Sequence, residues 1–161
     1  MSSESLVQQI EHALSTRPPG EAVGAALETL VRHYAAHMGT VHRLDAADRH
    51  LYLVASSGPI PEPVLAVTRR IPLGKGIAGE AAATGKAVSI CNLQSPTAGV
   101  PAGARAAGAS GALCVPILQG ESIVGTLGIG CAGERTFTDT ETADLLAAGR
   151  VLADAVVRSV S

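Results

Sequence analysis

Aromatic side chains are almost missing from this sequence. Among 161 residues only Tyr34, Tyr52 and Phe137 are aromatic, and there is no tryptophan. Flat cofactors such as haem are usually held by bulky and aromatic walls, and single-stranded nucleic acid is usually bound by stacking on aromatic rings. The formal net charge of −2 also provides no basic footprint for DNA or RNA. We therefore expect no nucleic-acid partner and no bound cofactor.

Long apolar runs and paired cysteines are also lacking. No stretch approaches the roughly 18 consecutive apolar residues of a membrane span, and the polar residues 1–11 are not typical of a secretory signal. The cysteines, Cys91, Cys114 and Cys131, are odd in number and have no Cys-x-x-Cys spacing, which indicates reduced thiols rather than a disulfide framework. We therefore expect a cytoplasmic protein without membrane contact.

The histidines do not form a recognisable metal-binding pattern. His33 and His37 lie one helical turn apart and could share a metal, but the His-Glu-x-x-His pattern and an obvious third ligand are both missing. Two surface or dimer-contact histidines explain this pair better, so we expect no metal. His42, in a predicted strand, is a candidate for the wall of a ligand pocket. The alternative for His42 is a solvent-facing or internally hydrogen-bonded side chain.

Small aliphatic residues dominate what is present. Hydrophobic residues make up 47 % of the chain and charged residues 16 %, and there are 18 glycines, so the core must consist of Ala, Val, Leu and Ile. The length fits a single domain with one core. We expect residues 1–20 to form an N-terminal helix and linker, and residues 21–158 to form the domain itself.

Helical periods at both ends of the chain enclose a region of strands. Apolar spacing predicts helices over residues 5–15 and 21–38, the latter stopped by Gly39, and a capping box of Thr138 and Glu141 predicts a last helix up to residue 157. The elements predicted between them are strands 40–44 and 50–56, a loop 58–63, a strand near the end of 64–71, a short helix 77–84, a strand 87–91, a long loop 92–111, and a hairpin of 112–119 with 122–130. Because regular βαβ alternation is absent, we expect an α/β (α+β) fold with a six-stranded antiparallel sheet. The N- and C-terminal helices should lie on one face, and the short helix and long loop on the other.

Three segments, in order, resemble the GAF domain family. They are residues 70–79 (RIPLGKGIAG) with 84–88 (TGKAV), the hairpin 112–130 with its VPI and VGTLGI patterns, and residues 135–139 (RTFTD) with the helix after them. The resemblance covers roughly residues 21–157. It implies a small-molecule sensor fold whose terminal helices commonly pair two copies and whose other sheet face commonly holds a ligand. We therefore predict a homodimer formed through the helices of residues 21–38 and 138–157.

The glycine-rich turn at residues 74–79 is the leading candidate for ligand contact. The first amides of the helix that follows have no partner within the helix, so they could bind an anion or a carbonyl oxygen. The alternative is that the glycines only permit a tight turn from strand to helix. Asn92 opens the long loop where the family usually has aspartate, and a turn cap is its alternative role. The predicted ligand-binding residues are Gly76, Ile77, Ala78, Gly79, Asn92, Leu93 and His42.

Together these features predict a sensor domain without enzyme activity. Its ligand would be compact, for example a small oxyanion such as nitrate, and its output would pass to a separate partner such as a sensor kinase. One group of the family reduces free methionine sulfoxide with a cysteine in the glycine turn and another in the loop before the fifth strand. Here Ala78 stands in the turn, and residues 92–111 contain no cysteine. A thiol-based reductase or redox sensor using Cys91 stays an alternative, as does a dimerisation module without a ligand.

Overall fold

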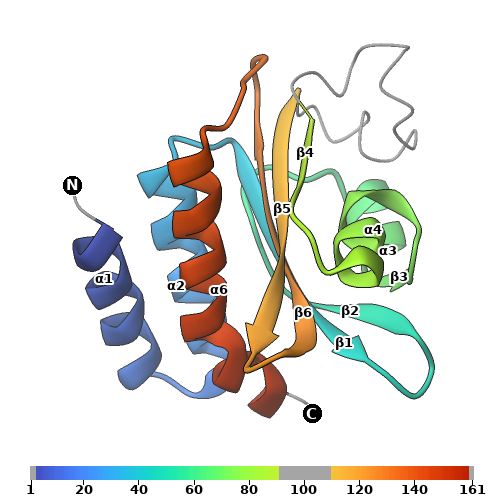
Figure 1. Cartoon of the computed structure of the whole chain (residues 1–161), viewed down its shortest axis with the longest axis horizontal. Helices are drawn as coiled ribbons and strands as arrows, with labels where there is room; N and C mark the ends of the chain where they lie inside the picture. Colours follow the sequence, from blue (N-terminus) through green and yellow to red (C-terminus); the bar gives the residue numbers. More distant parts are fainter. Residues whose placement is uncertain (1–2, 91–109, 160–161) are drawn as a thin grey trace.

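A six-stranded antiparallel sheet forms the middle layer of the molecule (Figure 1). The computed structural model describes residues 3–90 and 110–159. The strands run across the sheet in the order β3-β2-β1-β6-β5-β4, and all neighbours are antiparallel. Their bounds are β1 (Met38–Asp45), β2 (His50–Ser57), β3 (Arg70–Pro72), β4 (Val88–Ile90), β5 (Gly111–Gln119) and β6 (Ser122–Cys131). The predicted fold class is confirmed.

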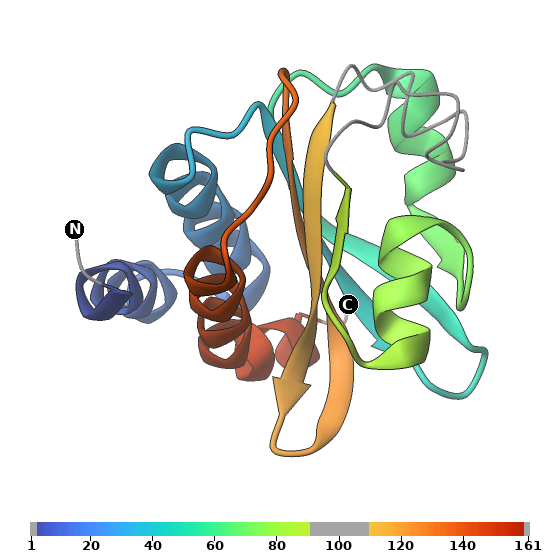
Figure 2. The same cartoon turned by 45° about the horizontal axis from the view of Figure 1, so that its top comes forward.

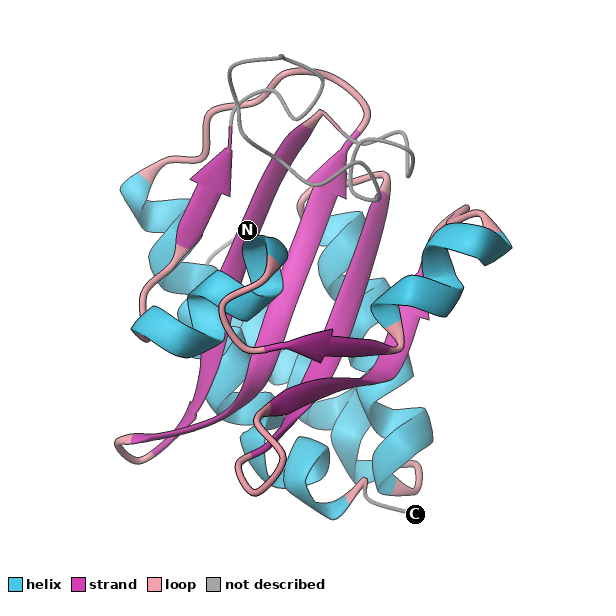
Figure 3. Cartoon of the chain, turned by 90° about the vertical axis from the view of Figure 1, so that its right-hand side faces the viewer, coloured by secondary structure: helices cyan, strands magenta, loops and turns pink. Residues whose placement is uncertain are grey.

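Helices cover both faces of this sheet (Figures 1 and 2). One face carries α1 (Ser3–Ser15), α2 (Pro19–His33) and α6 (Asp139–Arg158), and the other carries α3 (Glu62–Thr68) and α4 (Gly76–Thr84). Figure 3 looks onto the face with α3 and α4. The terminal helices therefore share one face, as predicted. The long loop predicted on the opposite face falls almost entirely outside the described residues.

The main core lies between the sheet and the layer of α1, α2 and α6. β5 directs Leu113, Val115 and Ile117 into this core, where they meet Leu27 of α2 and Leu152 of α6, and all five are fully buried. Successive side chains of a strand point to opposite faces, so large residues at every second position of β5 select the face that meets the helices. The predicted core of aliphatic residues is found here.

α1 is packed onto the outer side of α2 and α6 (Figure 2). Its Leu6 and Ile10 are buried in the same core as the two longer helices. The spacing of four residues places both side chains on one face of the helix. Residues 3–15 are thus joined to the core of the domain, and a boundary at residue 20 stays a prediction.

α2 ends earlier than predicted. It stops at His33 instead of residue 38, because Ala35 adopts a left-handed conformation with φ of 50° and β1 already begins at Met38. Gly39, predicted to stop the helix, lies in β1, where a Cβ atom would come within 2.9 Å of the Leu27 and Val31 side chains. This glycine therefore serves the close approach of β1 to α2.

α3 was not predicted. The prolines near residues 59–63 indicated a loop, with a strand afterwards, but Pro61 stands at the N-cap position of α3 and Pro63 occupies its first turn. Proline is tolerated there because first-turn amides have no partner within a helix. Only β3, three residues long, remains of the predicted strand.

A clamp of hydrogen bonds joins the end of α2 to the start of α6. The predicted capping box is confirmed: the Glu141 amide donates to Thr138 Oγ1 at 3.0 Å, and the Thr138 amide donates to Glu141 Oε1 at 2.9 Å. Arg135 donates to Glu141 Oε2 at 2.6 Å and to the Tyr34 carbonyl, and the Tyr34 hydroxyl donates to the Glu141 carbonyl at 2.8 Å. The hydrogen bond from Thr138 and the nearby Arg135 together hold the pKa of Glu141 below its ordinary value.

Candidate ligand-binding site

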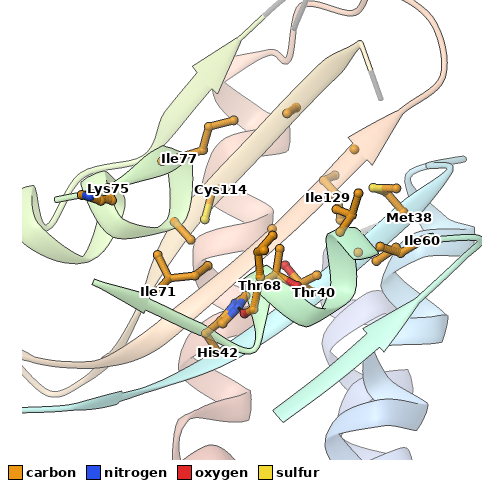
Figure 4. A pocket seen from close by; sticks show the side chains of 18 of the residues that line it. Met38, Thr40, His42, Ile60, Thr68, Ile71, Lys75, Ile77, Cys114 and Ile129 are labelled. Atoms are coloured by element: carbon orange, nitrogen blue, oxygen red, sulfur yellow. Dashed lines mark hydrogen bonds between the residues drawn. The ribbon is translucent and has the colours of Figure 1, made fainter. Parts of the chain in front are cut away.

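A cavity of about 360 Å³ lies between the sheet and helices α3 and α4 (Figure 4). Its floor consists of side chains and glycines from the three central strands, namely Thr40, His42, Ala112, Cys114, Gly128 and Gly130. Val64 and Thr68 of α3 and Ile71 of β3 form one wall, and the first turn of α4 forms another. Most of this lining is aliphatic, which is typical of pockets for small molecules.

Small residues on the floor leave room for the cavity. A Cβ atom built on Gly128 would meet Cys114 Sγ at 3.5 Å and Thr40 Oγ1 at 3.6 Å, which are ordinary contact distances. The fold could therefore accommodate a Cβ atom at Gly128. Its absence keeps space open between the Cys114 thiol and the Thr40 hydroxyl.

Glycines shape the turn that brings α4 to the cavity. Gly74 and Gly76 have φ of 87° and 67°, a left-handed region that disfavours other residues. A Cβ atom on Gly79 would lie 2.7 Å from the Pro72 carbonyl oxygen, and the Gly74 amide donates to the Gly79 carbonyl at 2.9 Å. These glycines therefore permit a tight turn between β3 and α4, which is the alternative role given for them from the sequence.

The start of α4 has no side-chain cap. Lys75 stands at the N-cap position and makes no capping hydrogen bond, and the Gly79 amide is the one that donates back to the Lys75 carbonyl at 3.1 Å. The amides of Gly76, Ile77 and Ala78 precede it and cannot pair within the helix. All three residues line the cavity, so the start of α4 forms part of its wall.

His42 is the polar residue buried most completely in the cavity floor. Its side chain is 2 % exposed, and burial lowers its pKa. Nε2 lies 2.8 Å from the carbonyl oxygen of Thr68. A carbonyl oxygen only accepts hydrogen bonds, so Nε2 carries the ring hydrogen and Nδ1 is a bare acceptor. Nδ1 has no hydrogen-bond partner among the described residues.

Thr126 lies beside His42 in the sheet. The two residues are paired across β6 and β1, so their side chains share the cavity face of the sheet. Thr126 is 1 % exposed, and its Oγ1 likewise forms no hydrogen bond of normal geometry within the part of the chain that is described. Two buried polar atoms without partners therefore occur at neighbouring positions.

The described cysteines are buried, as their positions in strands predicted. Cys114 lines the cavity, and burial raises the pKa of its thiol to about 12, while the neighbouring Thr126 side chain acts in the opposite direction. Cys131 lies on the helix side, where its Sγ accepts a hydrogen bond from Arg135 at 3.3 Å. Cys91 falls outside the described residues.

The structure brings together part of the predicted ligand site. Gly76, Ile77, Ala78 and His42 line one cavity, although they come from two segments more than thirty residues apart in sequence. Gly79 is buried against β3 and does not line it. The other two predicted residues, Asn92 and Leu93, are outside the described residues.

Sequence reasoning missed Cys114, Gly128 and the residues of α3 as parts of the site. Cys114 and Gly128 could have been found, because β5 and β6 alternate large residues with small ones and the small ones share a face. The α3 residues gave no such signal, since that helix was not predicted.

The described residues contain no group of three or more His, Cys, Asp or Glu side chains placed to hold a metal ion. No helix in residues 3–90 or 110–159 has the length and apolar character to cross a membrane.

Several solved structures share this fold. The GAF domain of an Acinetobacter phosphoenolpyruvate-protein phosphotransferase has a TM-score of 0.80 and 15 % identity, covering 98 % of this chain and 95 % of that one. The corresponding GAF domain from Coxiella burnetii has a TM-score of 0.77 and 16 % identity, with 96 % and 92 % covered. The free methionine-R-sulfoxide reductase of Neisseria meningitidis, solved with its substrate, has a TM-score of 0.78 and 18 % identity, with 98 % and 89 % covered. At these identities the likeness establishes the fold alone.

We expected the chain to lack enzyme activity, and this prediction is wrong because the fold does not support it. A methionine-R-sulfoxide reductase superposes on nearly the whole chain about as well as GAF domains of a phosphotransferase do. The same architecture thus serves an enzyme, and the fold does not decide enzyme status in either direction.

A comparison of the sequence with family models identifies the family of this chain. No curated protein matches the chain, but the family model for the GAF domain matches residues 16–157. This range includes the glycine turn, the closing hairpin and the last helix, which are the segments that carry the resemblance. With the family model over most of its length and the fold of solved GAF domains, the chain belongs to the GAF domain family.

Proposed function

We propose that this chain is a small-ligand-binding sensor domain, and that its ligand binds in the cavity beneath α3 and α4. One observation carries the proposal: a cavity of about 360 Å³ has mainly aliphatic walls, the uncapped start of α4 among its lining residues, and in its floor a buried His42 whose Nδ1 has no hydrogen-bond partner among the described residues. Ligand sites in proteins usually combine an apolar lining with a few well-placed polar groups. GAF domains also commonly bind small ligands, which agrees with this assignment.

A small oxyanion such as nitrate is our candidate for the group bound at α4. The amides of Gly76, Ile77 and Ala78 point out of the start of a nine-residue helix, where the helix dipole favours negative charge. Lys75, which also lines the cavity, adds a positive charge beside them. The proposed contacts for the ligand at this end are therefore backbone N–H groups rather than side chains.

Titration with nitrate, nitrite, phosphate and sulfate tests this candidate. Thermal unfolding should shift upward with the preferred anion, by roughly 5–10 °C when the anion is at a hundred times its Kd, because such binding adds about 2.7 kcal/mol. Gly128→Val, which fills the floor without touching α4, is the matched variant. No response to any of the four anions at millimolar concentration would remove the oxyanion, while binding of another compound that Gly128→Val blocks would keep the cavity as the site.

We further propose that occupancy of the cavity is reported to a separate signalling protein in the cytoplasm, from a homodimer built on α2 and α6. α1 already covers part of both helices, so the dimer would use what α1 leaves exposed, including Val157, which is 38 % exposed. Sedimentation analysis of the full chain and of Val157→Asp tests this. A monomer at all concentrations would remove the dimer.

A second candidate function is thiol-dependent reduction of free methionine sulfoxide. The likeness to a reductase over nearly the whole chain and the Cys114 thiol in the cavity favour testing it. A reductase assay on the wild type, Cys114→Ser and Cys91→Ser separates the possibilities. If the wild type reduces methionine sulfoxide and either variant loses this activity, the reductase replaces the sensor proposal. If the wild type and both variants have the same activity, the sensor proposal stands.

A further inference from the structure

The cavity is larger than the oxyanion proposed at α4 requires. Its volume is about 360 Å³. One water molecule takes up about 30 Å³ of the liquid, and a bare anion such as nitrate is not much larger. Nitrate alone would therefore leave most of the cavity unfilled, with its aliphatic walls in contact with water. Because burial of apolar surface is favourable, a ligand that also covers these walls should bind more tightly than the bare anion.

The two ends of the cavity differ in their chemistry. Figure 4 shows Lys75 and Ile77, at the start of α4, at one end of it. Met38, Ile60 and Ile129 lie at the opposite end. The first end has the uncapped amides of α4 and a positive charge, while the far end has only apolar side chains among these residues. The small residues of β5 and β6 in the floor leave space between the two ends.

The charged residues that line the cavity in the described part of the chain are both basic. They are Arg70 of β3 and Lys75, and the described lining residues include no Asp or Glu. The sequence of residues 91–109, which lie outside the described ranges, contains no Asp or Glu either. A cation that is removed from water normally needs an anionic partner, and nearby positive charges repel it. The cavity therefore favours a ligand with a negative charge and disfavours one with an ammonium group.

We infer that the ligand is a carboxylate with a compact aliphatic body and no ammonium group. The carboxylate would lie at the start of α4 beside Lys75, and the body would extend over the floor toward Met38 and Ile60. Arg70 already donates a hydrogen bond from Nε to the Tyr52 hydroxyl at 3.3 Å, so Lys75 is the side-chain cation that we assign to the head group. The inference rests on the proposed function, because it keeps the oxyanion group at α4 and adds the rest of the molecule.

Matched compounds test the class of ligand on the wild-type protein, so this test does not depend on a variant that folds. They are 4-methylpentanoate, its amide, leucine and acetate. The amide lacks the charge, leucine is the same acid with an added ammonium group, and acetate has the head group without the body. Calorimetric titration should give a Kd for 4-methylpentanoate at least about tenfold lower than for each of the other compounds, a preference of about 1.4 kcal/mol.

A series of straight-chain carboxylates measures the contribution of the body. Each added CH₂ group that is buried against the aliphatic walls should lower the Kd about three- to fourfold. This decrease should stop once the body fills the cavity. Gly128→Val reduces the space at the floor, so in this variant the decrease should stop at a shorter chain. A Kd that does not change with chain length in the wild type would place the anion outside the cavity and overturn the inference.

Lys75→Gln tests the position of the head group. It should weaken the binding of 4-methylpentanoate about threefold and leave the binding of the amide unchanged, because only the acid carries a charge. Lys86→Gln is the matched control, since this exposed lysine follows the C-cap of α4 and does not line the cavity. It should change the binding of neither compound. Equal effects of the two substitutions on the acid would contradict the assignment of Lys75 to the head group.

The results of the titrations distinguish this inference from the proposed function. If nitrate, the amide or leucine binds as tightly as 4-methylpentanoate, the inference is overturned and the cavity remains the proposed ligand site. If neither the carboxylates nor the four inorganic anions bind, the proposed function is overturned as well.

Discussion

The two faces of the sheet are built by the same strands from side chains of different size. β5 sends Leu113, Val115 and Ile117 to the helix layer but Ala112 and Cys114 to the cavity, and the helix-facing positions are filled without exposed surface. β6 does likewise, with glycines on the cavity side. The face toward the helix layer is therefore closely packed, while the small side chains on the other face leave space for the cavity. The difference predicts that equal changes on the two faces have unequal effects.

The largest effect should come from truncating the packed face. Leu113→Ala removes a fully buried side chain that contacts the helix layer, so the free energy of unfolding should fall by about 2–5 kcal/mol. Urea denaturation of the variant and the wild type measures this. Ala112→Val, one residue away on the cavity face, is the control, and a loss as large as that of Leu113→Ala would contradict the contrast between the faces.

Filling the cavity face should change binding more than stability. Gly128→Val adds side-chain atoms where a Cβ meets only ordinary contacts, so we expect affinity for a cavity ligand to fall at least about tenfold, or 1.4 kcal/mol. Calorimetric titration gives the affinity, and thermal unfolding should change little. Gly125→Ala is the comparison: its Cβ would collide with the backbone oxygen of His42, so this substitution should destabilise the fold. Unchanged ligand affinity in Gly128→Val would place the ligand elsewhere.

The cavity face should also add a pH dependence of its own. The pKa of His42 is lowered in the folded state by burial, so the unfolded chain binds a proton at this position first as the pH falls below about 6.5. Stability from this residue is complete above that pH and decreases below it, by at most about 1.4 kcal/mol per pH unit. Denaturation curves between pH 7.5 and 5.5 measure the slope, which His42→Gln should reduce. A slope unchanged by His42→Gln would show that other groups cause it.

The smallest effect is expected at the clamp on the helix side. Thr138→Ala removes the cap of α6 and should cost about 1 kcal/mol in denaturant unfolding. Because the folded-state pKa of Glu141 is lowered, its contribution is present above about pH 4.5 and is lost as the pH falls further, whereas the contribution of His42 already begins to fall below about pH 6.5. Glu141→Gln should flatten that acidic branch and leave the His42 branch unchanged. A change in the slope between pH 7.5 and 5.5 in Glu141→Gln would contradict the separate origin of the two effects.

Local rules in the sequence predicted most of the scaffold. Apolar spacing and the capping box of Thr138 and Glu141 are local signals, and they located the last helix and the central strands. The early end of α2 was missed because Gly39 was interpreted through its backbone freedom, while its actual constraint is the close contact of β1 with the Leu27 and Val31 side chains of α2. α3 was missed because prolines permit a loop and a first helical turn equally well.

The site was predicted less completely than the scaffold, because its chemistry depends on pairing between strands. The residues at the start of α4 follow one another, so their free amides could be inferred from the sequence. The position of Thr126 opposite His42 depends on the register of β1 against β6. The tautomer of His42 depends on the Thr68 carbonyl of α3. Neither contact can be inferred from the sequence of one segment alone.

The clamp of Tyr34, Arg135, Thr138 and Glu141 has a mechanical consequence. It ties the last residues of α2 to the first turn of α6, directly beyond the end of β6. The two helices therefore resist sliding past each other and would shift as a single rigid body. A displacement of the segment after β6 would therefore move both helices together rather than one of them alone.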